Sequence, residues 1–235
     1  MLDLLISEPF LGFSKESLDF LSKLKNKRNN NKEWFDKHRD IYEDYIKVPM
    51  RSLLDNLSAE LKKTDERIVV SPKSVFRINR DVRFKKDKIP YKSHYSAAIT
   101  YDRIKTPELP LFYFHLSSDE FFFAAGQYST DNNLINKLRR NIIRNEDKFL
   151  SLIHKKDFLR TFGKVNGEAL VNVPLEYRSN TTLKDETKEL IKMKQMYVFK
   201  SYKPEVGLSD ELMDLIVKNI SITNDFNKFL YDSVK

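Results

Sequence analysis

Apolar residues recur at helical spacing through the N-terminal third of the chain. Leucines three residues apart, behind a serine suited to capping, predict a helix over residues 11–24. A second apolar stripe starts after Asn31 and runs into Pro49, whose missing N–H predicts a kink near Val48. Beyond that kink, leucines and a methionine at helical spacing predict a further helix over residues 50–61.

The hydrophobic period changes from helical to alternating after residue 71. Positions 76–84 of one parity are apolar except for Arg80, and those of the other parity are polar, which predicts a strand with two different faces. We expect the apolar face to be buried, with Phe76, Ile78, Val82 and Phe84. We expect the other face to be polar and exposed, with Arg77, Asn79, Asp81 and Arg83.

Two hairpins follow from the alternating runs. A second such run, 94–101, comes after a charged connection and predicts an antiparallel hairpin over residues 75–101. Residues 111–128 predict another hairpin that turns at 117–119. Further on, the pattern predicts helices and one strand; the helices cover 131–144, 147–162, 185–193, 209–219 and 223–231, and the strand covers 196–202.

The order of these elements indicates the fold class. Strands and helices do not alternate as βαβ units, which favours an α+β fold with an antiparallel sheet. We therefore expect a sheet built from two hairpins, packed by N-terminal and C-terminal helices, in a single domain over residues 1–235.

Composition excludes several classes of site. There is no cysteine, so disulfides, thiolate zinc sites and cysteine nucleophiles are excluded. Five scattered glycines make a P-loop or a dinucleotide-binding loop improbable. The N-terminal residues 1–12 lack the basic region of a secretory signal, and no run is long and apolar enough for a membrane span. We expect a cytoplasmic protein without a membrane partner.

Positive charge is concentrated in one segment. The chain has a formal net charge of +8, from 42 basic and 34 acidic residues. Residues 71–105 hold ten Lys or Arg against three Asp, which is a net charge of +7. A local concentration of this kind indicates an anion site or a solvated basic loop.

The polar face of the first hairpin offers the groups for an anion site. Arg77 and Arg83 present planar forks that suit a phosphate or carboxylate, and Lys88 and Lys92 add point charges from the connection. Asp81 and His94 share the polar parity and are the candidates for acid–base catalysis. The expected ligand is an anionic small molecule or one that contains phosphate; we assign the site no metal and no cofactor.

Four other interpretations of this segment stay open. Asp81 can pair with a flanking arginine, which makes the polar face a structural ion-pair ladder. Arg80 points to the apolar face, so we expect a structural ion pair with a helix carboxylate or bonds to backbone carbonyls. The basic strip can also act as an open surface for nucleic acid or protein. Of its aromatic residues, only Tyr91 and Tyr101 are then candidates for stacking on bases. Asp81 and Asp87 could converge on a metal only if the loop folds back, and the surrounding lysines argue against it.

The run from Phe76 to Lys92 resembles the signature F-R-x-x-R-D-x-R-F-x-x-D-K-x-P-Y-K of domain of unknown function family 2461. The resemblance extends over residues 10–202 and includes the asparagine-rich entry 30–35, Tyr113 with His115, and Gly126. The chain departs from the family at residues 174–177. The family tends to have Pro-x-Gly-Tyr there, whereas this chain has Pro-Leu-Glu-Tyr. The resemblance implies a family fold and a site on the signature; it implies no reaction.

Overall fold

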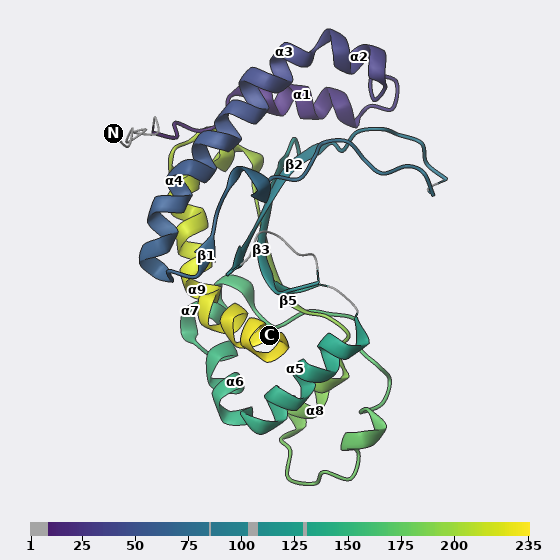
Figure 1. Cartoon of the computed structure of the whole chain (residues 1–235), viewed down its shortest axis with the longest axis vertical. Helices are drawn as coiled ribbons and strands as arrows, with labels where there is room; N and C mark the ends of the chain where they lie inside the picture. The colour runs from purple at the N-terminus through teal and green to yellow at the C-terminus, as the bar shows by residue number, and fades with distance from the viewer. Residues whose placement is uncertain (1–8, 85, 103–107, 129–130) are drawn as a thin grey trace. The chain divides into compact units, whose positions relative to one another are not determined.

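The computed structural model describes residues 9–84, 86–102, 108–128 and 131–235 (Figure 1). The N-terminal residues 1–8 and three cations of the basic segment, Lys85, Arg103 and Lys105, lie outside the described residues. Contacts divide the chain into two compact units. Unit 1 comprises residues 1–104, 113–123 and 201–218, and unit 2 comprises residues 105–112, 124–200 and 219–235. The single domain expected from the sequence stays a prediction.

Within the described residues, the strands form one five-stranded antiparallel sheet in the order β1-β2-β3-β4-β5. The strands are β1 (Ile68–Val69), β2 (His94–Tyr101), β3 (Leu111–Ser117), β4 (Phe121–Gln127) and β5 (Met196–Tyr202). Consecutive strands are neighbours, and β1 pairs with β2 through Ile68 opposite Tyr101. The expected α+β fold and the hairpin over 111–128 are confirmed, with a turn closed by the Ser117 N–H donating to the Glu120 carbonyl.

Unit 1 begins with helices that carry the predicted apolar stripes. They are α1 (Lys15–Lys25), α2 (Lys32–Lys37), α3 (Arg39–Tyr42) and α4 (Val48–Thr64), with a π-helical segment, Glu43–Lys47, ahead of α4. Pro49 has no N–H to donate to the carbonyl of Tyr45, four residues earlier. That carbonyl accepts a hydrogen bond from the Ser17 hydroxyl at 2.6 Å instead. The predicted kink is therefore a π-bulge, which α1 stabilises.

Aromatic and aliphatic side chains of these helices form the core of unit 1 with the inner faces of β2 and β3. Phe20, Leu21 and Leu24 of α1 are almost fully buried, as are Leu53 and Leu57 of α4. On the sheet side the buried residues are Ala97, Ile99, Tyr101, Phe114 and Leu116. Burial of this apolar area is the main contribution to the stability of the unit.

Unit 2 is mostly helical, with α5 (Asn132–Arg144), α6 (Glu146–Ile153), α7 (Lys156–Phe162) and α8 (Asp185–Lys192). The helix predicted over 147–162 divides at Lys155, whose backbone is extended. Arg139 of α5 is buried and donates to the carbonyls of Ile191 and Met193 at 2.7 and 3.2 Å, which fixes α5 against the end of α8. Gly126 has φ of 131°, and a Cβ there would lie 2.3 Å from the Met196 carbonyl oxygen, so this position requires glycine.

The C-terminal helix differs from its prediction. The sequence predicted two helices, over 209–219 and 223–231, whereas α9 runs unbroken from Glu211 to Val234. The Thr223 hydroxyl donates to the Asn219 carbonyl at 2.7 Å, so this polar side chain is satisfied within the continuous helix. Within the described part of the chain, no helix is both long enough and apolar enough to cross a bilayer.

The predicted strand over 76–84 is also corrected. Val75 and Asn79 form isolated antiparallel bridges with Ala97 and Tyr91, and no regular strand develops between or beyond them. The two bridges are four residues apart on one side, 75–79, and six apart on the other, 91–97, so the longer side bulges opposite residues 76–78. Ile78 is buried as expected, whereas Phe84 is 94% exposed.

Candidate functional site

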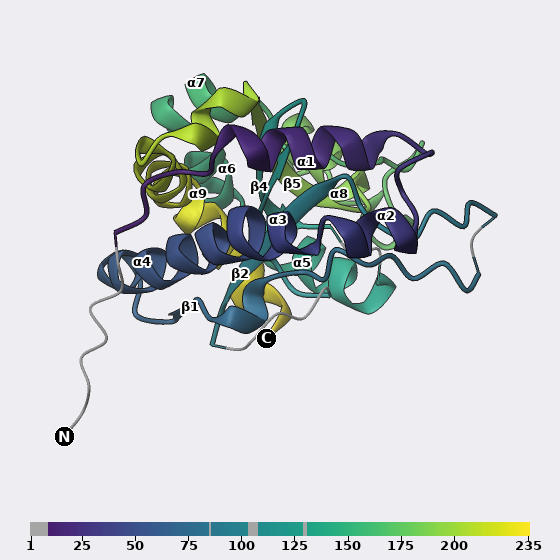
Figure 2. The same cartoon turned by 90° about the horizontal axis from the view of Figure 1, so that it is seen from above.

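Residues 75–92 form an irregular two-stranded ribbon that leaves the sheet at β2 and belongs to unit 1. The Lys92 N–H donates to the Ile78 carbonyl at 2.9 Å, and the Arg80 N–H donates to the Pro90 carbonyl at 2.8 Å. Both views show the ribbon extending past α2 (Figures 1 and 2). We call residues 75–80 and 89–92 the root of the ribbon and the described residues 81–84 and 86–88 its tip.

A buried asparagine fixes the root. The side chain of Asn30 accepts from the Tyr91 N–H at 3.0 Å and donates to the Tyr91 carbonyl at 3.0 Å. It also donates to the Leu24 carbonyl at the end of α1 at 2.8 Å. The Tyr91 ring stacks on Phe35 of α2 with the centroids 4.1 Å apart. The root is thus tied to α1 and α2 at once.

A hollow of about 330 Å³ lies beside the root. Its polar lining comes from Lys25, Asn30, Arg80, Lys92 and His94. Among the described residues, the lining includes three cations and no Asp or Glu. An opening lined in this way favours a negatively charged group.

Each of the three cations has a neighbour that sets its position. Lys25 pairs with Asp119 at 2.6 Å, and Arg80 pairs with Asp87 at 3.0 Å. The bonds from Lys25 and Arg80 hold the pKa of each of these carboxyls below its usual value. The Lys92 ammonium lies over the Phe76 ring, 5.3 Å from its centroid. Both ion pairs are solvent-exposed, so an anion in the hollow competes with partners that bind weakly.

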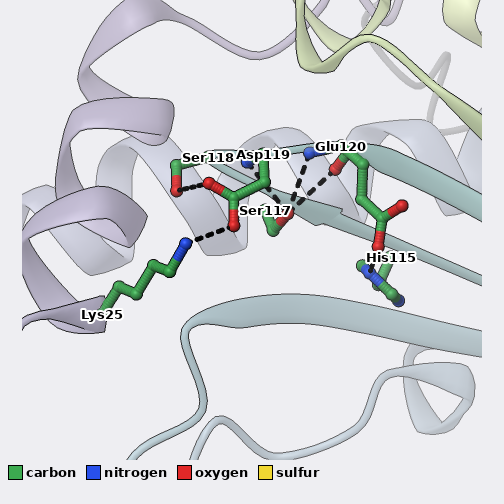
Figure 3. A network of polar contacts seen from close by, with 6 residues as sticks. All are labelled: Lys25, His115, Ser117, Ser118, Asp119 and Glu120. Atoms are coloured by element: carbon green, nitrogen blue, oxygen red, sulfur yellow. Dashed lines mark hydrogen bonds and ion pairs between the residues drawn. The ribbon is translucent and has the colours of Figure 1, made fainter.

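Two histidines meet at the edge of the hollow. The rings of His94 on β2 and His115 on β3 are 4.8 Å apart, and His115 Nε2 lies 3.5 Å from a Glu120 carboxylate oxygen (Figure 3). Burial, His115 and Lys92 together lower the pKa of His94 from 6.5 to about 4, against the opposing effect of Glu120. Burial also lowers the pKa of His115, while Glu120 acts in the opposite direction. His94 is therefore neutral at pH 7.

The hairpin turn between β3 and β4 supports both histidine and lysine. The Ser117 hydroxyl accepts from the N–H groups of Asp119 and Glu120 at 3.1 Å, and Figure 3 shows the two carboxylates diverging from this turn. One carboxylate reaches Lys25 of α1 and the other reaches His115. The turn therefore orients groups on two sides of the hollow.

The structure brings together some of the site residues expected from the sequence and separates others. Lys92 and His94 line the hollow, whereas Arg77, Arg83, Lys88 and Asp81 do not. Arg83 binds Asp81 through two side-chain hydrogen bonds, of 2.7 and 3.0 Å, at the exposed tip. The Lys88 ammonium donates to the carbonyls of Val82 and Arg83 at 3.0 and 3.3 Å, which closes the tip on itself.

Arg80 forms an ion pair, but with a partner that the sequence did not indicate. We expected a helix carboxylate or backbone carbonyls, and the structure has Asp87 of the same ribbon. Since residues 76–84 are not a regular strand, the parity that placed Arg80 on the core side does not apply. Asp81 and Asp87 each bind an arginine, and the described residues contain no group of three or more His, Asp or Glu side chains suited to a metal ion.

Sequence reasoning missed Lys25, the position of Asn30 and the role of His115. Lys25 and His115 are far from the ribbon in sequence, so neither spacing nor charge pattern connects them to it. Asn30 and His115 did fall in segments that resemble the family, which was the available signal.

The family model "Conserved hypothetical protein (DUF2461)" matches residues 16–229. The chain belongs to this family. The match includes both the ribbon and the hollow, and it extends past the region 10–202 for which the sequence showed a resemblance. A comparison with curated proteins found none that matches the chain. The description of the family names no activity, so a function for this chain is inferred from the geometry of unit 1.

Proposed function

We propose that unit 1 binds the phosphate or carboxylate group of a small ligand in the hollow beside the ribbon root. The observation that carries the proposal is the lining: Lys25, Arg80 and Lys92 with no carboxylate among them. Arg80 supplies a planar fork and Lys92 a point charge, the two donor types that recognise such oxyanions.

The hollow is built before a ligand arrives. Asn30 holds the backbone of Tyr91 with two hydrogen bonds, and Tyr91 is adjacent to Lys92 in the chain. Anchoring of this kind lowers the entropy lost on binding, because the side chains that contact the ligand already stand on fixed backbone.

His94 would give the same site an acid–base group. Its neutral imidazole lines the hollow and can accept a proton from a ligand whose anionic group is held by Lys92 and Arg80. His115, held by Glu120, contacts the His94 ring and acts as its positioning residue. On this proposal the protein is an enzyme if the bound ligand presents an acidic O–H or C–H to His94, and a binding protein otherwise.

Anion titration tests the proposal. Inorganic phosphate should raise the melting temperature of the wild-type chain, because a ligand that binds the folded state stabilises it. Lys92→Met, which keeps an unbranched apolar side chain and removes the charge that lies over Phe76, should blunt that rise. Lys73→Ala removes an exposed lysine outside the hollow and should leave the rise unchanged.

A third variant separates the hollow from the wider anion site expected from the sequence. Arg77 is exposed and does not line the hollow, so Arg77→Ala should respond to phosphate as the wild type does. Equal loss in Arg77→Ala and Lys92→Met would favour the wider site over the hollow. A wild type that no phosphate or carboxylate stabilises would overturn the proposal.

A further inference from the structure

The tip of the ribbon carries an aromatic side chain in solvent. Phe84 is 94% exposed, the highest exposure of the large apolar side chains in the described residues. The sequence pattern placed it on the buried face with Ile78, but the ribbon leaves the sheet beyond Asn79 and no layer covers its far half. A phenyl ring exposed in this way offers apolar area that a partner can cover with a gain in free energy.

Basic residues neighbour this ring in the chain, and one of them lies over it. The Arg83 guanidinium lies 5.8 Å from the centroid of the Phe84 ring, and Lys86 and Lys88 follow it in the tip. Arg77 in the root and Lys73 just before the ribbon are also exposed, and neither has an acidic partner within the described part of the chain. The acids of this stretch, Asp81 and Asp87, are already paired with Arg83 and Arg80.

The tip is separate from the hollow. Phe84, Arg83 and Lys86 are absent from the lining of the hollow, which lies at the root. In Figures 1 and 2 the far end of the ribbon points away from the helices of unit 1. A ligand that uses the tip therefore need not enter the hollow, and this inference does not depend on the anion site.

We propose that the ribbon tip is a binding surface for single-stranded nucleic acid. Phe84 would stack on an unpaired base, Arg83 and Lys86 would contact the phosphates beside it, and Arg77 of the root would contact a phosphate farther along the strand. An aromatic platform among cations is the arrangement by which proteins bind single strands without reading their sequence. The charge of the ribbon is complementary to a polyanion, which distinguishes this partner from an uncharged protein surface.

A single strand suits the tip better than a duplex. Its bases are free to stack on an outside ring, whereas a duplex step must first be unstacked at a cost of a few kcal/mol. The ribbon offers few cations and one exposed ring, so binding should be moderate in affinity. With about three phosphates neutralised, the affinity should fall with salt at a logarithmic slope near −2.

Fluorescence anisotropy with labelled oligothymidylate and oligouridylate of about 16 nucleotides tests the proposal in the full-length chain. Phe84→Ala should weaken binding about tenfold, the loss expected for one stacked base, and leave the salt slope unchanged. Arg83→Ala together with Lys86→Ala should reduce the slope. Tyr128→Ala, which removes another exposed aromatic ring, should leave the affinity unchanged.

Each alternative result has a definite meaning. Equal affinity of Phe84→Ala and wild type would overturn the proposal, as would tighter binding of a duplex of the same length. Binding to phosphatidylserine vesicles that needs Phe84, with no binding to either oligonucleotide, would assign the tip to a membrane surface instead and overturn it as well. Loss of oligonucleotide binding in Lys92→Met but not in Phe84→Ala would show that the strand uses the hollow, again against the proposal.

Discussion

The root and the tip of the ribbon come from one continuous signature, yet they have opposite environments. At the root, Ile78 and Tyr91 are buried, and Asn30 satisfies the backbone of Tyr91. At the tip, Phe84 is exposed and Arg83 pairs with Asp81 in open solvent. Hydrogen bonds and packing hold the root, whereas exposed ion pairs hold the tip. A conspicuous sequence motif can thus contain one half that fixes the fold and another half that is free to meet a partner.

The largest effect on this comparison should come from Asn30→Ala. The substitution leaves the N–H and carbonyl of Tyr91 and the carbonyl of Leu24 buried without their partner. Unsatisfied groups of this kind cost about 1–3 kcal/mol each, although water reaching the site limits the sum. We expect the free energy of unfolding to fall by about 2–4 kcal/mol in urea denaturation.

The neighbouring asparagine provides the control. Asn29 is half-buried and its only side-chain hydrogen bond shown among the described residues is to the Lys23 carbonyl at 3.1 Å, so Asn29→Ala should cost much less than Asn30→Ala, at most about 1 kcal/mol. If both variants lost the same stability, the root would not owe its order to the buried amide, and the contrast with the tip would fail.

The next-largest effect should come from acid, through His94 on β2 beside the root. The pKa of His94 is about 4 in the folded chain and near 6.5 when unfolded, so the unfolded state takes up the proton first as pH falls. Stability is fully present above pH 6.5 and declines between pH 6.5 and 4. His94 is partly solvated, so we expect its share to be about 1–2 kcal/mol.

His94→Gln isolates that share. Its unfolding free energy should decline less steeply with acid than that of the wild type, and the remaining slope should include His115, whose pKa is lowered in the same direction. Parallel profiles for the two proteins across pH 6.5 to 4 would contradict the assignment of His94 as a neutral group beside Lys92.

Local patterns predicted the fold wherever local physics decides it. The helical stripes of α1 and α4, the hairpin of β3 and β4 and the kink before Pro49 all follow from spacing and from missing donors, and the structure has them. Where the decision depends on what lies opposite, the pattern failed. Alternation over 76–84 implied a regular strand with one buried face, but the extra residues between Tyr91 and Ala97 interrupt the pairing, and Phe84 at the far end is not covered.

The candidate site shows the same limit. Lys92 and His94 could be chosen from charge and parity, because they lie where the ribbon still pairs. Lys25 and His115 could not, because only folding brings α1 and β3 to the hollow. Arg77 and Arg83 were chosen by strand parity and Lys88 as a point charge of the connection, yet residues 76–84 are not a regular strand, so a shared parity does not imply a shared site.

The smallest effect should come from breaking the ion pair at the tip. The side chains of Arg83 and Asp81 are 77% and 60% exposed, and solvent screens their attraction while each loses rotamer freedom. The 2.7 Å hydrogen bond to Asp81 raises the pKa of Arg83. Both side chains can exchange this bond for hydrogen bonds to water. We expect Arg83→Ala, Asp81→Ala and the double variant to melt within the scatter of replicate wild-type measurements. A double-mutant cycle in low salt and at physiological salt measures the coupling, which should be near zero at the higher salt. Strong coupling that survives salt would mean that the tip is organised as firmly as the root, and that Phe84 is held in solvent by a rigid support.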